Sequence, residues 1–253
     1  MTWVTGRAPS DNYADVLVLG DNRVLTADQT DSERYFSFNI FNFGWKYRNF
    51  TPGGMRTLGS DGRWTGVGGA PNNNWTALAS NSDGSRLLAA ARDGANANGG
   101  YDGALYLAEP AANGDIVWTD ITRGAATNGT WVAVDMDASG QFLVAALRGG
   151  QIYTADTRET NWKWKATAVS ADWTSVWMAD DGKTLAATAT GGAGGVWVSR
   201  NGGNSWTRVS DTIGNDLDWR GVALDAATGD VIAIASGKPI YRFAVAAQGA
   251  APN

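Results

Sequence analysis

The sequence contains no histidine and no cysteine. Without histidine, the chain cannot build a Ser-His-Asp or Cys-His catalytic group, and it cannot bind a metal ion through imidazole. Without cysteine it has neither disulfides nor thiolate chemistry, which fits a reducing compartment or a domain that needs no cross-links. These absences exclude the commonest nucleophilic hydrolases and zinc enzymes, and we expect no metal site and no cofactor.

Charge and long apolar runs are also scarce. Charged residues make up 18% of the chain and the net charge is −5 with interspersed signs, so we expect no nucleic-acid surface. No apolar run is long enough to span a bilayer. We expect no signal peptide, because Met1, Thr2 and Trp3 already fit a strand. The protein is then cytoplasmic or associated with a virion or another assembly, unless a leader has been removed. The oligomeric state stays open.

What the sequence does contain is a repeat. The clearest copy has an aromatic strand at 173–176, the turn Asp181-Gly182, strands at 184–187 and 195–198, and a final Trp206. Self-similarity with a period of about 40–50 residues is typical of β-propellers and related arrays. The residues that open the copies are Tyr13, Trp75, Trp131, Trp173 and Trp219. The sequence predicts an all-β protein, a single five-bladed β-propeller.

The predicted blades cover residues 13–50, 75–122, 131–169, 173–210 and 219–245, with an inserted hairpin or loop at 51–73. The third strands fall at 35–38, 104–107, 151–154, 195–198 and 239–242. The fourth strands carry Trp45, Trp118, Trp164 and Trp206. The last copy lacks a fourth strand, but residues 1–6, with Trp3, resemble one. We expect this first strand to complete the last blade, which closes the ring and removes exposed edges. Residues 1–253 would then form one complete domain.

The turns between the first two strands of each copy favour this interpretation. They carry Gly84, Gly140, Gly182 and Gly229, each after Asp, Ser or Thr, and such pairs tolerate the positive φ of tight hairpins. The strands between them are rich in the β-branched and aromatic residues that fill a pleated surface. The sequence therefore predicts short antiparallel strands throughout.

The segment from Ser199 to Trp206 resembles the Asp-box, or BNR repeat, in which Asn201 replaces the Asp, Gly203 keeps the glycine and Ser205 replaces the Thr. Residues 60–65 match the same motif more weakly. In that family the motif is a turn between the third and fourth strands of a blade, and its Trp packs into the blade. The resemblance implies a propeller fold and carries no activity, because Asp-box propellers include sialidases, lectins, assembly factors and sorting receptors.

A catalytic role is not favoured by the carboxylates. Five-bladed glycosidases use paired carboxylates on inner strands. Here the glutamates are Glu33, Glu109 and Glu159, at peripheral positions, and only Asp15 and Asp135 lie in first strands near the predicted channel. A glycosidase therefore stays the least favoured alternative.

The candidate ligand contacts are aromatic residues that the repeat pattern does not account for as core. Trp64 lies in the inserted segment and Tyr101 in a Gly/Asn-rich loop, with Arg63 and Asn98 as polar neighbours. We expect Trp162 to face away from Trp164, and Trp177 to lie on an inner strand near the channel. Aromatic faces beside polar donors suit a sugar ring.

The pattern leaves two main functions open. The first is a lectin-like glycan-binding module. The second is a structural or assembly protein, such as a virion or surface-layer component, that uses the propeller as a disc for protein partners. A propeller is a scaffold, so the fold does not choose between them.

Overall fold

The computed structural model describes residues 12–18, 24–29, 34–39, 42–47, 55–58, 64–71, 73–92, 103–113, 115–122, 124–125, 129–213, 217–225 and 228–244. Up to residue 47, and at residues 56, 58, 64, 65 and 168, the backbone alone is described. All elements in these ranges are strands, and their neighbours pair in antiparallel fashion. The prediction of an all-β chain is therefore confirmed for the part of the chain that is described.

The strands form meanders in which sequence neighbours pair. The first sheet contains β1 (Asn12–Val18), β2 (Val24–Gln29), β5 (Met55–Leu58) and β6 (Trp64–Gly66). The second contains β7 (Trp75–Ser80), β8 (Leu87–Ala91), β9 (Ala104–Pro110) and β10 (Ile116–Asp120). A six-stranded sheet follows, with β11 (Trp131–Met136), β12 (Phe142–Asp156), β13 (Lys165–Met178), β14 (Leu185–Thr190), β15 (Gly195–Ser199) and β16 (Thr207–Arg208). The last contains β17 (Trp219–Leu224), β18 (Val231–Ala235) and β19 (Tyr241–Phe243).

The six-stranded sheet holds two repeats. The N–H of Thr157 donates to the carbonyl of Gln141 over 2.9 Å, so the two ends of β12 lie side by side and the strand doubles back on itself. Gly149, with φ of 66°, lies at this reversal. The first half of β13 then pairs with β12 and its second half with β14. We call the units that begin with β11 and with the second half of β13 the third and fourth repeats.

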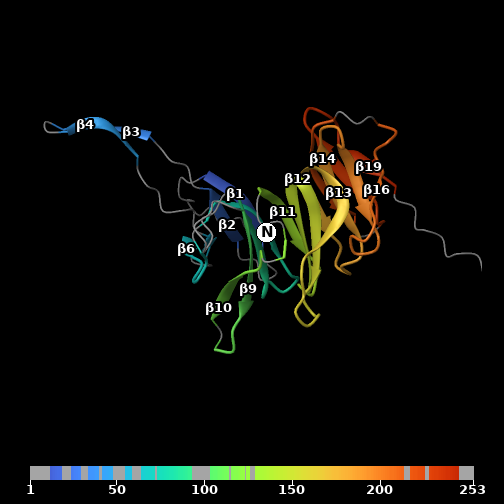
Figure 1. Ribbon diagram of the computed structural model, residues 1–253, viewed down its shortest axis with the longest axis horizontal. Helices are drawn as coiled ribbons and strands as arrows, with labels where there is room; N and C mark the ends of the chain where they lie inside the picture. The colour runs from blue at the N-terminus through green and yellow to red at the C-terminus, as the bar shows by residue number, and fades with distance from the viewer. Residues whose placement is uncertain are drawn as a thin grey trace, which may run out of the picture.

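The first repeat differs from the expectation. Strand β2 pairs with β5, and β5 pairs with β6, so residues inside the expected insertion 51–73 supply the third and fourth strands. The segment with Trp45 instead forms a separate hairpin of β3 (Arg34–Asn39) and β4 (Asn42–Tyr47), which projects from the first sheet in Figure 1. The sequence assignment failed because this hairpin has the same alternating aromatic pattern as a strand pair of the repeat.

The backbone repeats one irregularity at the start of every copy. The register shifts immediately after the opening aromatic residue, between Trp75 and Ala77 in the second repeat and between Tyr13 and Asp15 in the first. The same shift follows Trp131, Trp173 and Trp219. A β-bulge bends the strand and increases its twist. The bulge therefore marks the same structural position in all five copies.

The predicted hairpin glycines also occupy equivalent positions. Gly84, Gly140, Gly182 and Gly229 have φ between 68° and 71°. This backbone conformation is open to glycine at no steric cost, and the tight turn requires it. The prediction of positive φ at these four turns is confirmed.

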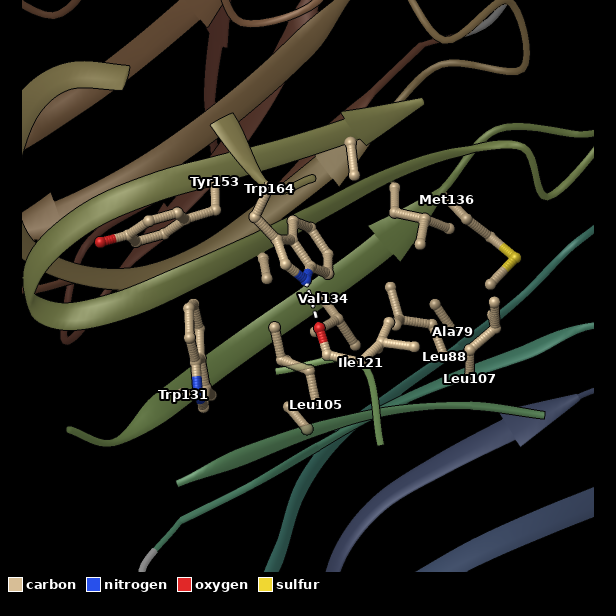
Figure 2. Packing of buried hydrophobic residues seen from close by; sticks show 14 of the residues in the cluster. Ala79, Leu88, Leu105, Leu107, Ile121, Trp131, Val134, Met136, Tyr153 and Trp164 are labelled. Atoms are coloured by element: carbon tan, nitrogen blue, oxygen red, sulfur yellow. Dashed lines mark hydrogen bonds between the residues drawn. The ribbon is translucent and has the colours of Figure 1, made fainter. Parts of the chain in front are cut away.

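Apolar side chains fill layers between successive sheets rather than one central core. One layer joins the second repeat, through Leu88 and Leu105, to the third, through Trp131, Val134 and Met136 (Figure 2). Similar layers join the first to the second repeat, the third to the fourth and the fourth to the fifth. The first strands β1, β7, β11, β13 and β17 also contact one another in that order. Each sheet between the two ends is therefore covered on both faces.

Each layer contains an edge-to-face aromatic pair. The opening tryptophan meets the aromatic residue of the third strand in similar geometry in the second to fifth repeats, with centroid distances of 5.1 to 6.3 Å and interplanar angles of 64° to 72°. The pairs are Trp75–Tyr106, Trp131–Tyr153, Trp173–Trp197 and Trp219–Tyr241. Each of the four opening tryptophans is fully buried.

In the described part of the chain, the row of sheets is open. In Figure 1, the first sheet, with β1 and β2, lies at the opposite end of the row from β19. None of the four apolar layers of described residues joins the fifth repeat to the first. Residues 1–6, which we expect to complete the fifth blade, lie outside the described residues.

We predict that two core tryptophans differ in their contribution to stability. Trp173 is fully buried and donates its indole N–H to the carbonyl of Gly150 over 3.0 Å, so Trp173→Ala should lower the free energy of unfolding by about 3–5 kcal/mol. Trp206 is only half-buried, so Trp206→Ala should cost less, about 2 kcal/mol. Urea denaturation measures both. Equal losses would contradict the layered core.

Candidate functional site

Four of the six candidate ligand contacts are not described with their side chains. Arg63, Asn98 and Tyr101 lie outside the described residues, and Trp64 is described by its backbone alone. The strand register nevertheless changes the interpretation of Trp64. It pairs with Leu58, whose neighbours across the sheet are Val24 and Val18.

That register gives Trp64 the same position as Trp118 of the second repeat. Trp118 pairs with Ala108, and Leu87 and Ser80 follow across the sheet. Trp64 is therefore the fourth-strand tryptophan of the first repeat, and it belongs to the repeat unit rather than to an insertion. The reason for selecting it as a ligand contact does not hold.

Trp162 lies at a pocket between the second and third repeats. The pocket has a volume of about 560 Å³ and is lined by Asp120, Ile121, Gly124, Asn161, Trp162 and Lys163. Its two sides come from the end of β10 and from the segment that precedes β13. The side chain of Trp162 is half-buried and also packs against the apolar layer between the two repeats. One edge of the indole is thus anchored while the pocket remains open.

Trp162 and Trp164 are neighbours, contrary to the expectation that they face opposite ways. Their ring centroids are 6.1 Å apart at an interplanar angle of 78°. In an extended chain, residues two apart project from the same face, which explains the contact. Trp164 is itself fixed, because its indole N–H donates to the carbonyl of Ile121 over 2.7 Å (Figure 2). Trp164 therefore supports the ring of Trp162 from behind, and Trp162 alone of the two lines the pocket.

The polar groups of the pocket are exposed and oriented. Asp120 accepts hydrogen bonds at Oδ1 from the N–H and from the hydroxyl of Thr122, over 2.9 and 2.6 Å. Asn161 has φ of 59°, a backbone conformation that Asn tolerates better than most residues. Lys163 is exposed at the opposite side of the turn. An acceptor, an amide and a cation therefore line the same pocket as the aromatic ring.

The turn from Ser199 to Trp206 is held by its own side chains. The hydroxyl of Ser199 accepts from the N–H of Gly203 over 2.9 Å. The amide of Asn201 accepts from the N–H of Ser205 and donates to its hydroxyl, both over 2.9 Å. Gly203 has φ of 85°, and a Cβ there would lie 2.8 Å from a methyl of Thr154. The side chains that resemble the Asp-box thus fix a tight turn against β12.

A second pocket of about 370 Å³ lies beside this turn, between the third and fourth repeats. It shares Lys163 with the Trp162 pocket. Asn201, Gly202 and Asn204 contribute its far side. The two pockets therefore lie on either side of the segment that contains Lys163.

Trp177 and Asp135 occupy the same position on adjacent first strands, four residues after Trp173 and Trp131. Trp177 is half-buried and lines neither of these two pockets. The carboxylate of Asp135 joins two strands, since it accepts from the N–H of Met178 over 2.7 Å and of Met136 over 2.9 Å. Burial raises the pKa of Asp135 to about 6, although these two hydrogen bonds oppose the shift. Asp135 therefore holds neighbouring repeats together.

Within the described ranges, no group of three or more acidic residues is placed to hold a metal ion. The same ranges contain no helix long and apolar enough to cross a membrane.

Comparison with known proteins gives a fold likeness. No protein-family model matches the chain, and no curated protein does. Among solved structures, the chain is similar to a structural genomics protein of unknown function from Bacteroides thetaiotaomicron VPI-5482, with a TM-score of 0.58 and 12% identity. The match covers 93% of this chain and 56% of the Bacteroides protein, so this chain spans little more than half the length of that protein. At this identity the likeness concerns the fold alone.

Sequence reasoning found Trp162 but missed the polar residues around it. Asp120, Asn161 and Lys163 come from two repeats, and the hydrogen bond from Trp164 to Ile121 joins the segments that carry them. One usable signal was the alternation of tryptophan and lysine in residues 162–165, which predicts that Trp162 and Trp164 share a face.

We predict a pH dependence of stability that Asp135 causes. Its pKa of about 6 lies above the value of about 3.9 for an exposed aspartate, so the folded state binds the proton more tightly. Stability should therefore fall as pH rises from about 4 to about 6, by about 2–3 kcal/mol from this group. Asp135→Asn keeps one acceptor oxygen and should flatten the profile. Urea denaturation at several pH values measures it, and parallel profiles for the variant and the original chain would contradict the assignment.

Proposed function

We propose that this protein is a non-catalytic, lectin-like module that binds a glycan in the pocket around Trp162. One observation carries the proposal: a half-buried indole and three exposed polar side chains line the same pocket of about 560 Å³. A sugar ring stacks its C–H face on an aromatic side chain and directs its hydroxyls to polar groups. Asp120, Asn161 and Lys163 provide an acceptor, an amide and a donor for those hydroxyls.

The pocket also has the rigidity that favours binding. Trp164 packs edge-on against Trp162 and is itself anchored to the carbonyl of Ile121. Asp120 is oriented by its two hydrogen bonds from Thr122. Groups that are already ordered lose less entropy when a ligand binds, so more of the contact energy appears as affinity.

We predict that Trp162→Ala abolishes glycan binding and changes the thermal melt by only a few degrees, because the ring is partly exposed. Trp162→Phe, which keeps a stacking face, should retain part of the affinity. Trp177→Ala is the matched control, since Trp177 is also half-buried but lines neither pocket. A glycan array followed by titration calorimetry on the best ligand measures the effect. Unchanged binding by Trp162→Ala, or loss of binding by Trp177→Ala alone, would reject the pocket as the site.

The five repeats are, in this proposal, the blades of a β-propeller, and residues 1–6 supply the fourth strand of the last blade. Three observations support it. The repeats share the bulge after the opening aromatic residue, their first strands follow one another side by side, and the fifth repeat has only the strands β17 to β19 in its described part.

The outward face of the fifth repeat supports closure as well. In the second repeat, Ala90 pairs with Ala77 and is fully buried against the third repeat. Its counterpart in the fifth repeat is Ile234, which pairs with Gly221 and is 48% exposed, and nearby Ile240 is 71% exposed. In every inner layer, this face of one repeat is buried by the next repeat. In a closed ring, the first repeat would therefore bury these two isoleucines.

We predict that deletion of residues 1–6 lowers the melting temperature by several degrees, because the edge of β19 loses its partner. A synthetic peptide of residues 1–8, added in excess, should restore the original melt. Light scattering on the intact chain gives the second readout. A monomer that needs residues 1–6 supports closure. If the deletion leaves the melting temperature unchanged, closure is rejected. If the intact chain is a dimer and Ile234→Asn dissociates it, the assembly hypothesis is favoured instead.

A further inference from the structure

The second pocket carries more positive than negative charge. Lys163, Lys165 and Lys183 line it, together with Asp156 and Glu159. Asp156 is already neutralised, because Arg158 donates from Nε to Oδ1 over 2.9 Å and from Nη2 to Oδ2 over 2.6 Å. Within the described residues, none of the three lysines forms an ion pair. The lining therefore contains three lysines against Glu159 and an Asp156 that is already paired.

Hydrogen bonds fix the side chain of Lys165 and the backbone at Lys183. The Nζ of Lys165 donates to the side-chain oxygen of Asn204, and the side-chain amide of Asn204 donates to the carbonyl of Asn201 over 2.6 Å. The N–H of Gly202 donates to the carbonyl of Lys183 over 2.9 Å, which joins the two turns that carry these residues. The pocket is thus built between turns that are hydrogen-bonded to each other. Such a site can receive an anion without large rearrangement.

We propose that this pocket binds the acidic group of the glycan, a sulfate or a carboxylate, while a neighbouring sugar ring stacks on Trp162. This inference rests on the proposed function and names the ligand class as an acidic glycan. Lys163 lines both pockets, so one chain of sugars can pass from the aromatic ring to the lysines. Ammonium groups form charge-assisted hydrogen bonds with such oxyanions, and amides such as that of Asn204 add further donors.

The test compares matched polymers on the intact chain. Dextran and dextran sulfate share a backbone and differ in sulfate, and polygalacturonate and its methyl ester differ in the carboxylate. The variant Lys165→Gln/Lys183→Gln spares Lys163, so it leaves the Trp162 pocket intact. Lys238→Gln is the control, because Lys238 is exposed and lines neither pocket.

We expect the double variant to bind an acidic polymer at least tenfold more weakly and its neutral counterpart unchanged, with a salt dependence that is reduced in parallel. The acidic polymer that responds identifies sulfate or carboxylate as the recognised group. The inference is overturned if the double variant and Lys238→Gln bind both acidic polymers with equal affinity. This outcome is separate from the proposed function, which would still stand if Trp162→Ala abolishes all binding.

Inorganic sulfate provides a readout that does not depend on any glycan. In the intact chain, a sulfate titration should shift the side-chain amide resonances of Asn204, and the double variant should lose this shift. A shift in the intact chain supports the anion pocket even where no polymer binds and the proposed function fails. The absence of any shift in the intact chain overturns the inference.

Discussion

The interaction on which the structure depends is the buried edge-to-face pair between the opening tryptophan of a repeat and the aromatic residue of its third strand. An indole edge carries partial positive charge and an aromatic face partial negative charge, so this arrangement contributes beyond the area that it buries. The pair recurs with nearly constant geometry in the second to fifth repeats. It fixes the first strand against the third, and the bulge after the tryptophan then bends the strand where the next sheet approaches.

This arrangement explains why candidate sites occur at the junctions between repeats. Large aromatic rings and small residues such as Ala90 are buried together in the apolar layers. Polar and charged side chains line the junctions near the turns, such as the turn from Ser199 to Trp206. The two pockets lie at such places, one on each side of Lys163. The scaffold is therefore rigid where it is apolar and accessible where its turns end.

Much of the fold could be predicted from the sequence, because each repeat carries local signals. Turn glycines such as Gly140 and Gly182, and the opening tryptophans, are specified by short-range sterics and burial. The first repeat could not be assigned in the same way. A hairpin that contains Trp45 and the true strand pair that contains Trp64 are equivalent in local pattern, and only pairing with β2 distinguishes them. Trp162 lies at a pocket, and its role as a ligand contact stays a prediction, but the expected orientation was wrong, since Trp162 and Trp164 are in contact.

The sequence by itself determined that the chain is all-β, where its hairpins turn, and which tryptophans recur. These features follow from residue type and spacing, which act over a few residues. The tertiary structure decided which strands join the first repeat, that Asp135 holds two first strands together, and that residues from separate repeats surround Trp162 and Lys163. Those outcomes depend on contacts between segments far apart along the chain, and a repeat pattern offers several equivalent partners for each strand until packing selects one.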